Sequence, residues 1–457
     1  MTTNKTIREP AREIPVIAET DVIVAGGGVA GIAAAVAAAR NGAKTLLIER
    51  YGCLGGTMSG VPMKWVGGYN PEVHGGIVRE LVEAARREKG VIREFYIPTV
   101  NGSMVGIYVD ALKKITLDMI ETAKVQLLLH AWAVEAIMDE GGKKLRGIII
   151  ESKSGRQAVL GKMIIDATGD GDIAALAKFP YEKGRPGDGK TQPMTAYGPR
   201  MLNVDTEKLL TFLQSYKKAN PKDLMECDIS LPNFTFGGFS DLLAKARKNG
   251  DIYLDYNALW VNCNHESRSV EIDGSFVPNV DGTNVFDLTH AETDSIKQVS
   301  SFEGFARKYL AGFEKSCRTD RGGFSIGVRE TRRIMGQYVI TEEDVAGGRS
   351  FPDGICRNTT AMDVHSPDGT QSWTPARCYE IPFRCLVPRE SVNLLVAGRC
   401  VSTTHRALAS VRFIPPCIGT GEAAGVAAAM AAADGIPIEK LDTQLLREKL
   451  KKQGVIL

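Results

Sequence analysis

The feature that most constrains the fold is a glycine-rich segment between two apolar runs near the N-terminus. Residues 21–49 read DVIVAGGGVAGIAAAVAAARNGAKTLLIE. This order is typical of a strand, a glycine turn, a helix and a second strand. Gly26, Gly28 and Gly31 form G-x-G-x-x-G, and Glu49 ends the second apolar run. An acidic residue about 20 residues after such glycines predicts a dinucleotide-binding unit rather than a glycine turn in an unrelated α/β unit.

Each part of this unit has a physical task in holding a dinucleotide. Gly26 permits a tight turn, Gly28 lets backbone approach a pyrophosphate, and Gly31 lets the helix pack on the strand. The first N–H groups of the helix are free to bind phosphate oxygens, and Glu49 can accept a hydrogen bond from a ribose hydroxyl. The predicted residues of this first site are Gly26, Gly28, Val29, Ala30, Gly31, Glu49 and Arg50.

Length and composition narrow the class of protein. A chain of 457 residues can hold two or three domains, and 44% hydrophobic with 24% charged residues is ordinary for a soluble protein. The net charge of +2 gives no general attraction to nucleic acid or membranes. Nine cysteines without a C-x-x-C pair favour reduced thiols. The polar start of the chain lacks an apolar signal core, so we expect a cytoplasmic protein.

The segments that follow predict a mixed α/β organisation. Helical periodicity marks residues 76–90 and 110–124, whereas the glycine-rich residues 51–60 predict irregular structure. Short β runs at 125–129, 132–138, 145–151 and 157–165 predict a meander that returns to the main sheet at 166–172. The sequence thus predicts a Rossmann-like α/β domain with a β-meander, formed by residues 1–184 and 326–457, and an inserted α+β substrate or cap domain, formed by residues 185–325.

Several further blocks carry a family resemblance. They are YGCLGGTMSG at 51–60, DATGDGD at 166–172, GVRETRRIMGQYVIT at 327–341 and YEIPFRCLVPRESVNLLVAGRCVSTTHRALASVRFIPPCIGTGEAAG at 379–425. Together with the first unit they resemble the FAD-dependent oxidoreductases of the glutathione-reductase-like superfamily. More narrowly, the chain resembles the family related to the flavin subunit of heterodisulfide reductase and, more distantly, fumarate reductase flavoproteins.

The resemblance implies FAD as the cofactor and adds residues to its site. A second glycine turn would meet the pyrophosphate, the A-T-G motif would pass the cofactor again, and a strand over 392–397 would end at Gly398. A helix starting near Thr420 would point its N-terminus at the flavin, unless its small residues serve only close packing. The implied residues are Gly55, Gly56, Thr57, Ala133, Ala167, Thr168, Gly169, Asp170, Gly398, Arg399, Gly419, Thr420, Gly421 and Ala424.

Two departures limit what the resemblance implies. Many superfamily members have an acidic residue where this chain has Arg399. No cysteine follows the second glycine turn, which argues against a dithiol mechanism. Cys53, just before that turn, is either a flavin attachment point or redox thiol, or a small buried residue.

The candidates for chemistry lie in the C-terminal blocks. His405 and His365 are candidate proton handlers because histidine titrates near neutral pH. Arg384 and Arg412 are candidates to hold a carboxylate. The alternative for either histidine is a structural, hydrogen-bonded role. We expect Arg329, Arg332 and Arg333 to form an internal ion-pair network or a scaffold beside the cofactor.

The sequence also separates possible functions. No metal-ligand set, iron–sulfur spacing or second G-x-G-x-x-G is present, which leaves FAD as the expected cofactor. The leading hypothesis is an oxidoreductase that transfers hydride between flavin N5 and a small polar, anionic organic substrate. An electron-transfer subunit with a partner redox protein is the alternative, and a nucleic-acid modifier is disfavoured by charge. We expect no membrane partner. A homo-oligomer is compatible with such an enzyme but not required.

Overall fold

The central element of the fold is a seven-stranded sheet built around the first glycine unit. The computed structural model describes residues 6–98, 101–229, 231–319 and 323–457. The strand order is β6-β2-β1-β9-β8-β7, and β22 also pairs with β9. Strands β6, β2, β1, β9 and β22 are parallel, whereas β7 and β8 continue from β9 as the antiparallel meander. The run at 125–129, which the sequence placed in the meander, is instead the parallel edge strand β6 beside β2. The strands are β1 (Val16–Ala25), β2 (Thr45–Ile48), β6 (Gln126–Leu128), β7 (Trp132–Met138), β8 (Leu145–Ser152), β9 (Gly155–Asp166) and β22 (Leu394–Val396).

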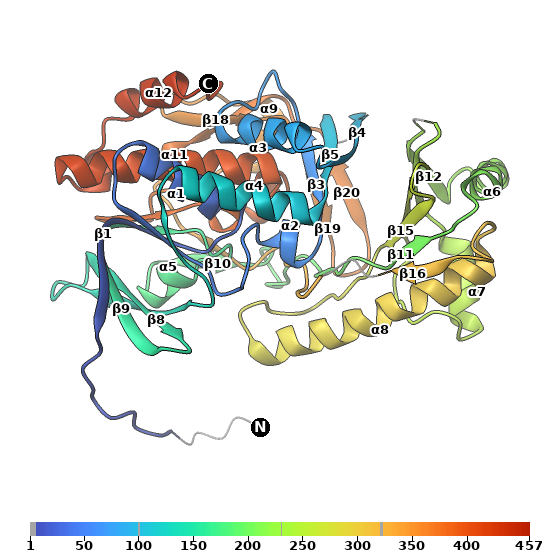
Figure 1. Ribbon diagram of the computed structural model, residues 1–457, viewed down its shortest axis with the longest axis horizontal. Coiled ribbons are helices and arrows are strands. Elements are labelled where there is room, and N and C mark those ends of the chain that lie inside the picture. Colours follow the sequence, from blue (N-terminus) through green and yellow to red (C-terminus); the bar gives the residue numbers. More distant parts are fainter. Residues whose placement is uncertain (1–5, 99–100, 230, 320–322) are drawn as a thin grey trace.

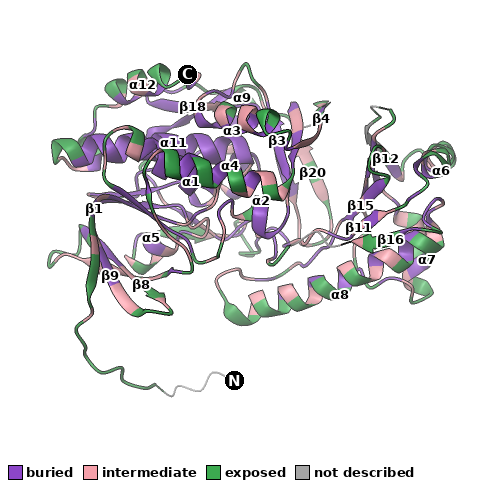
Figure 2. Cartoon of the chain, viewed as in Figure 1, coloured by how far each residue is buried: buried purple, intermediate pink, exposed green. Residues whose placement is uncertain are grey.

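Two alanine-rich helices, α1 (Val29–Arg40) and α11 (Ile414–Asp434), pack against each other beside this sheet. Figure 2 shows that α11 is buried over most of its length. A Cβ atom at Gly421 would overlap the carbonyl oxygen of Ala30, and one at Gly425 would overlap that of Ala34. Small residues therefore bring the two helix backbones into close contact.

The start of α11 differs from the sequence prediction. The helix begins at Ile414 rather than near Thr420, so Thr420 lies inside it. Pro415 and Pro416 occupy its first turn, where a missing N–H costs nothing and a fixed φ fits the helix. The expected irregular segment 51–60 also contains a short helix, α2 (Thr57–Gly60).

A three-stranded antiparallel sheet lies on the side of this unit that faces the insertion (Figure 1). It has the order β3-β5-β4 and was not predicted from sequence. Its strands are β3 (Trp65–Tyr69), β4 (Val91–Ile97) and β5 (Gly102–Ile107), and the predicted helices beside it are α3 (Gly76–Arg87) and α4 (Val109–Thr122).

The insertion has its own sheet and its own core. The strand order is β12-β13-β14-β15-β11-β16, and every pairing is antiparallel. Phe234, Phe236 and Val261 point to one face and are fully buried with residues of the insertion's helices. The elements are β11 (Arg200–Leu202), α6 (Thr206–Ala219), β12 (Leu224–Asp228), β13 (Phe234–Gly238), α7 (Ser240–Lys248), β14 (Leu259–Asn264), β15 (Ser269–Asp273), α8 (Val285–Tyr309) and β16 (Cys317–Thr319).

The chain enters and leaves the insertion at adjacent points. Strand β10 (Tyr181–Lys183) pairs with β17 (Arg332–Ile334), and Thr195 pairs with Gly327. The predicted boundaries near 184 and 325 stay predictions. The remaining elements are α5 (Asp172–Leu176), α9 (Glu342–Gly347), β18 (Gly354–Asn358), β19 (Met362–His365), β20 (Gln371–Thr374), β21 (Tyr379–Pro382), η2 (Phe383–Cys385), η3 (Gly398–Cys400), α10 (His405–Val411), η4 (Ile438–Lys440) and α12 (Thr443–Lys452).

The contact between α1 and α11 predicts a large cost for a single methyl group. We expect Gly421→Ala to lower the free energy of unfolding by about 1–3 kcal/mol, because the added Cβ forces the helices apart. The matched control is Gly304→Ala on α8, where a Cβ meets nothing within 4 Å. That change should stabilise the protein by about 0.5–1 kcal/mol. Denaturant unfolding of both variants measures the difference, and equal effects would contradict the packing argument.

Candidate functional site

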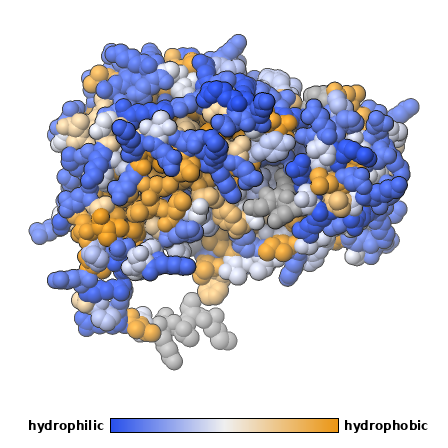
Figure 3. Space-filling model, viewed as in Figure 1, coloured by the Kyte–Doolittle hydropathy of each residue, from blue (hydrophilic) through white to orange (hydrophobic). Residues whose placement is uncertain are grey.

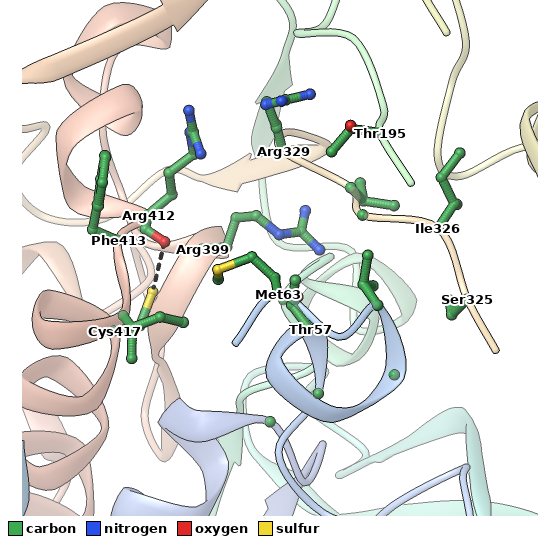
Figure 4. Close-up of a pocket in the computed structure, with 18 of the residues that line it drawn as sticks. Thr57, Met63, Thr195, Ser325, Ile326, Arg329, Arg399, Arg412, Phe413 and Cys417 are labelled. Carbon is green, nitrogen blue, oxygen red and sulfur yellow. Dashed lines mark hydrogen bonds between the residues drawn. The ribbon is translucent and has the colours of Figure 1, made fainter. Parts of the chain in front are cut away.

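A large cavity lies where the glycine turns, the three-stranded sheet and the insertion meet. Its volume is about 940 Å³. Figure 4 shows side chains of Thr57, Arg399, Arg412 and Arg329 around it, contributed by separate segments of the chain. The cavity is thus shared by the main unit and the insertion.

The two glycine turns form a backbone cradle at one end of the cavity. Gly28 is the residue before α1, so no side chain at that position caps the first N–H groups of the helix. The first turn of α1 holds no acidic residue. The N–H of Gly55 donates to the carbonyl oxygen of Gly27 at 2.9 Å. A Cβ at Gly56 would lie 2.9 Å from the Cα of Gly28. Such a cradle, with free helix N–H groups and no repelling carboxylate, fits a pyrophosphate.

Glu49 is held rigidly beside this cradle. Its carboxylate accepts the N–H of Gly27 at 2.6 Å and that of Tyr51 at 2.8 Å. Burial raises the pKa of Glu49, although the hydrogen bonds from Tyr51 and Gly27 oppose that rise. Glu49 also lines the cavity, and each carboxylate oxygen has a second lone pair that can accept a ribose hydroxyl.

The segment after β9 forms a wall of the cavity next to the first glycine turn. Asp166 is fully buried, and its carboxylate accepts the N–H groups of Thr168 at 3.1 Å and Ala174 at 2.9 Å. A Cβ at Gly26 would lie 2.5 Å from the carbonyl oxygen of Ala167. Only glycine with its positive φ of 102° therefore permits this contact between turn and strand end.

Arg399, which follows Gly398 after strand β22, makes an ion pair with Asp170. Its Nη2 lies 2.7 Å from Oδ1 of Asp170, which also accepts the Thr331 hydroxyl at 2.8 Å. Burial alone would raise the pKa of Asp170, but Arg399 holds it below its ordinary value. The arginine thus neutralises a carboxylate of the A-T-G-D segment in the cavity wall.

Most of the predicted cofactor residues line the large cavity together. They are Gly26, Gly28, Val29, Ala30, Glu49, Arg50, Gly55, Gly56, Thr57, Ala167, Thr168, Gly169, Asp170, Gly398 and Arg399. Ala133 lies in a smaller adjoining cavity of about 50 Å³ with Glu49, Arg50 and Trp132. Sequence reasoning omitted Trp132, which is 57% exposed, although an aromatic residue next to Ala133 was visible.

Five other predicted cofactor residues lie outside the cavity lining. Gly31 lies under the turn, where a Cβ would overlap the carbonyl oxygen of Gly26. Gly419, Thr420, Gly421 and Ala424 are buried inside α11, because that helix starts earlier than expected. Thr420 accepts the N–H of Gly398 at 3.1 Å and so fixes the strand end. The α11 residues in the cavity lining are Ile414 and Cys417, together with Phe413 just before the helix.

The predicted residues His365 and Arg412 meet at Asp363. The carboxylate of Asp363 lies 3.0 Å from Nε2 of His365 and 3.2 Å from Nη2 of Arg412, and it accepts Nε2 of Gln371 at 2.8 Å. Burial alone would raise the pKa of Asp363, but His365 and Arg412 hold it well below its ordinary value. Asp363 is therefore an ionised acceptor at neutral pH.

The electrostatics also fix the state of His365. Burial, reinforced by repulsion from Arg329, lowers the pKa of His365 to about 4. The ring is therefore neutral at pH 7. Because Asp363 can only accept, Nε2 of His365 carries the hydrogen and Nδ1 carries the lone pair.

Arg329 is a site residue that sequence reasoning assigned to a scaffold. It lines the cavity and donates to the carbonyl oxygen of Pro193 at 2.6 Å. Burial and the neighbouring Arg412 lower the pKa of Arg329 to about 10. Tyr197, Tyr256 and Trp373 line the same region and were also missed, because the insertion and the β19–β20 hairpin carry no motif.

His405 and Arg384 lie away from the cavity lining. His405 is buried, with Nδ1 2.8 Å from Oε2 of Glu330, and Glu330 also pairs with Arg333. His405 thus has the hydrogen-bonded, structural environment that was the alternative to a catalytic role. The pair of Glu330 and Arg333 belongs to the ion-pair network expected for the R-E-T-R-R block. Arg384 pairs with Asp353 at 3.0 Å. Cys53 lies near the second turn, its Sγ 3.8 Å from Oγ of Ser59.

The comparison with protein families matches nearly the whole chain. A family model described as FAD dependent oxidoreductase matches residues 21–450. The chain belongs to this family. FAD is its cofactor, and the glycine cradle, Glu49 and the A-T-G-D wall are the residues that fit it. No curated protein matches the sequence of this FAD-dependent oxidoreductase.

Solved structures resemble the FAD-dependent oxidoreductase only distantly. A geranylgeranyl bacteriochlorophyll reductase-like protein from Thermoplasma acidophilum is 17% identical, with 95% of this chain and 83% of that chain covered and a TM-score of 0.45. p-Nitrophenol 4-monooxygenase from Pseudomonas putida is 8% identical, with 96% and 85% covered and a TM-score of 0.48. GidA from Aquifex aeolicus is 15% identical, with 96% and 68% covered and a TM-score of 0.46. Similarity at this level carries no argument about substrate.

Among the described residues, no helix combines the length and the apolar character that crossing a membrane requires. Hydrophilic side chains predominate on the insertion in the view of Figure 3, whereas hydrophobic atoms are visible between them on the main unit.

The fixed position of Glu49 predicts a measurable contribution to FAD affinity. We expect Glu49→Gln to raise the Kd for FAD about tenfold, because the amide cannot accept from Gly27, Tyr51 and a ribose hydroxyl together. Titration of the apoprotein with FAD measures the change. Glu140→Gln, in an exposed turn, is the control and should bind FAD as the parent does. Equal affinity in both variants would exclude Glu49 from the ribose site.

The low pKa of His365 predicts a pH-dependent stability. Its folded pKa of about 4 lies below the ordinary 6.5, so the folded state binds fewer protons between these values and stability falls as pH falls. The cost reaches about 3 kcal/mol near pH 4. Between pH 7 and pH 4, the free energy of unfolding of His365→Gln should therefore fall by about 3 kcal/mol less than that of the parent. Urea unfolding at saturating FAD measures both values. His290→Gln, at an exposed site on α8, should follow the parent.

Proposed function

We propose that this FAD-dependent oxidoreductase transfers hydride between flavin N5 and a small polar, anionic organic substrate. The observation that carries this proposal is the cluster of Arg329, Arg412, His365 and Asp363 in the wall of the FAD cavity. FAD supplies the hydride acceptor or donor. The residues of the chain must then bind the substrate, orient it and handle one proton.

The charge balance of the cluster favours an anion. Asp363 offsets one positive charge through its contact with Arg412, and His365 is neutral. Arg329 has a carbonyl oxygen as its hydrogen-bond partner and stays protonated at neutral pH even with its lowered pKa. One positive charge therefore remains in a buried wall. A carboxylate or another anionic oxygen of the substrate would compensate it with strong, charge-assisted hydrogen bonds.

His365 is suited to accept a proton from the substrate. Asp363 holds the Nε2–H, which fixes the ring and leaves the lone pair on Nδ1. Gln371 and Arg412 in turn hold Asp363, so the base rests on a hydrogen-bonded support. A neutral histidine at pH 7 acts as a base in the oxidative direction, and the protonated ring would return the proton in the reductive direction.

A closer kinship is part of the proposal. The blocks at 327–341 and 379–425 support placing the chain with relatives of the flavin subunit of heterodisulfide reductase. They supply Arg329, Arg399 and Arg412 to one cavity. The absence of a cysteine after the second glycine turn supports direct hydride transfer instead of dithiol chemistry.

The experiment uses the purified holoenzyme under anaerobic conditions. Hydroxy acids, amino acids and saturated dicarboxylic acids are added in turn, with the matching uncharged alcohols and amides as controls. We expect an acid to bleach the oxidised flavin band and its uncharged counterpart to leave it unchanged. Bleaching by the uncharged compounds alone would overturn the anionic assignment.

Variants then test which residues act. For the acid that bleaches fastest, we expect Arg412→Gln to lower kcat/KM about a hundredfold, or about 3 kcal/mol, with FAD still bound. Arg384→Gln is the matched control, because Arg384 lies outside the cavity lining and pairs with Asp353. Turnover unchanged in Arg412→Gln, or lowered equally in Arg384→Gln, would contradict the assignment.

A further inference from the structure

The cavity extends beyond the FAD cradle into a space between two antiparallel sheets. One wall is the face of β3-β5-β4 that carries Trp65, Phe95 and Met104. The other is the face of the insertion sheet that carries Trp260 and Asn262. We name this space the inter-sheet chamber, lined by Trp65, Phe95, Ile97, Met104, Thr235, Trp260 and Asn262.

The alternation of each sheet directs these side chains into the chamber. Val66 and Val105, the strand neighbours of Trp65 and Met104, are fully buried in the core of the main unit. Val261, the neighbour of Trp260, is fully buried in the core of the insertion. Because successive side chains of a strand point to opposite faces, the large chamber residues are free of these cores.

Glycines opposite the large side chains shape the chamber. A Cβ at Gly106 would lie 2.7 Å from the ring of Trp65, and one at Gly237 would overlap the ring of Trp260. A Cβ at Gly67 would lie 3.1 Å from Sδ of Met104. The two tryptophan rings and the thioether therefore lie against bare backbone on the chamber faces of the two sheets.

The polar side chains on the insertion wall bond to one another. Thr235 donates to Asn262 at 3.2 Å, and Asn262 donates to Asp273 at 3.1 Å. Asp273 also accepts the N–H of Gly198 at 3.2 Å. The contacts that the chamber offers a ligand are therefore mainly apolar and aromatic.

Phe413 joins the chamber to the cationic cluster. The guanidinium of Arg412 lies 5.6 Å from the Phe413 ring centroid. A Cβ at Gly67 would lie 3.5 Å from the same ring, which places Phe413 next to Met104. Figure 4 shows Phe413 and Arg412 together at the start of α11. A cationic end and an apolar end are thus parts of one continuous cavity.

The walls are fixed relative to each other by charged contacts between the sheets. Lys64, just before β3, forms an ion pair with Glu271 of β15. Nη1 of Arg93 on β4 lies 3.3 Å from the carbonyl oxygen of Phe234 and 3.2 Å from that of Cys263. A preformed chamber of this kind is typical of a ligand site.

We propose that the anionic substrate is amphiphilic and not polar throughout. Its acid group lies at Arg412 and Arg329, and its apolar body fills the inter-sheet chamber. The body is an aryl group or an alkyl chain, since the chamber offers rings and a flexible thioether to either. The position of the acid group rests on the proposed function, whereas the apolar body rests on the chamber alone.

Calorimetric titration of the oxidised holoenzyme tests the ligand class. The probes are naphthalene-2-carboxylate, decanoate and acetate, which share the acid and differ in the apolar body. We expect naphthalene-2-carboxylate or decanoate to bind at least tenfold more tightly than acetate, and the tighter of the two identifies an aryl or an alkyl body. Equal, weak binding of all three would overturn the proposal.

Variants separate this inference from the proposed function. The measured quantity is the ratio of the Kd for acetate to the Kd for the tighter of the two larger probes. We expect Met104→Gln to reduce this ratio at least fivefold, and Trp260→Leu to do the same if Met104→Gln fails to fold. Met138→Gln on β7 is the matched control, because Met138 is also half-buried on a strand but packs on the core of the main unit. A ratio that stays unchanged in both Met104→Gln and Trp260→Leu would overturn the chamber assignment.

Arg412→Gln gives the remaining distinction. We expect it to weaken naphthalene-2-carboxylate and acetate by similar factors. A different result is that Arg412→Gln leaves the binding of both acids unchanged while Met104→Gln weakens the binding of the larger probe. That result would contradict both the anionic substrate and the amphiphilic substrate, and only an apolar ligand site would remain. If Arg412→Gln weakens both probes and Met104→Gln has no effect, the proposed function stands and the apolar body fails.

Discussion

The close approach of three backbone segments at Gly26 is the contact on which the rest of the structure depends. Gly26 meets Ala167 at the end of β9, and Gly31 brings α1 onto the same turn. This contact places the N-terminus of α1 at the end of the parallel sheet, where ligands bind in such folds. The second turn at Gly56 and the helix α11 then pack on α1 through further small residues. A side chain at Gly26 would meet the backbone of Ala167 and separate the turn before α1 from the sheet.

The charges around the cavity serve two different purposes. Arg399 and Asp170 neutralise each other in the FAD wall, so this pair stabilises a loop without attracting a further ion. Arg329 lies next to His365, the base of the proposed function, and donates to the carbonyl oxygen of Pro193, and no carboxylate of the described residues forms an ion pair with Arg329. In the proposed function, arginine therefore has a structural role at position 399 and binds the substrate at position 329, according to whether an acidic side chain lies within reach.

The insertion contributes one wall of the cavity. Its sheet packs one apolar face on its own helices, and Phe234 and Val261 are fully buried there. The other face, with Trp260 and Asn262, closes the cavity against β3-β5-β4. Both sheets are antiparallel, and alternation lets each serve a core and a site at once. The shape of the substrate space is a property of the two sheets together.

The sequence by itself determined the FAD unit, because its contacts are local or depend on glycines whose spacing is visible. The strand, turn and helix at Val22, Gly28 and Val29, the meander and most of the cradle follow from periodicity and motif. Only the tertiary structure decided the rest. It placed His365 and Arg412 beside Asp363 and placed His405 beside Glu330, although the sequence nominated both histidines for the same role. It also recruited Arg329 and Trp260 to the cavity. Which side chains share a cavity depends on contacts between residues far apart in sequence, and neither propensity nor spacing encodes those contacts.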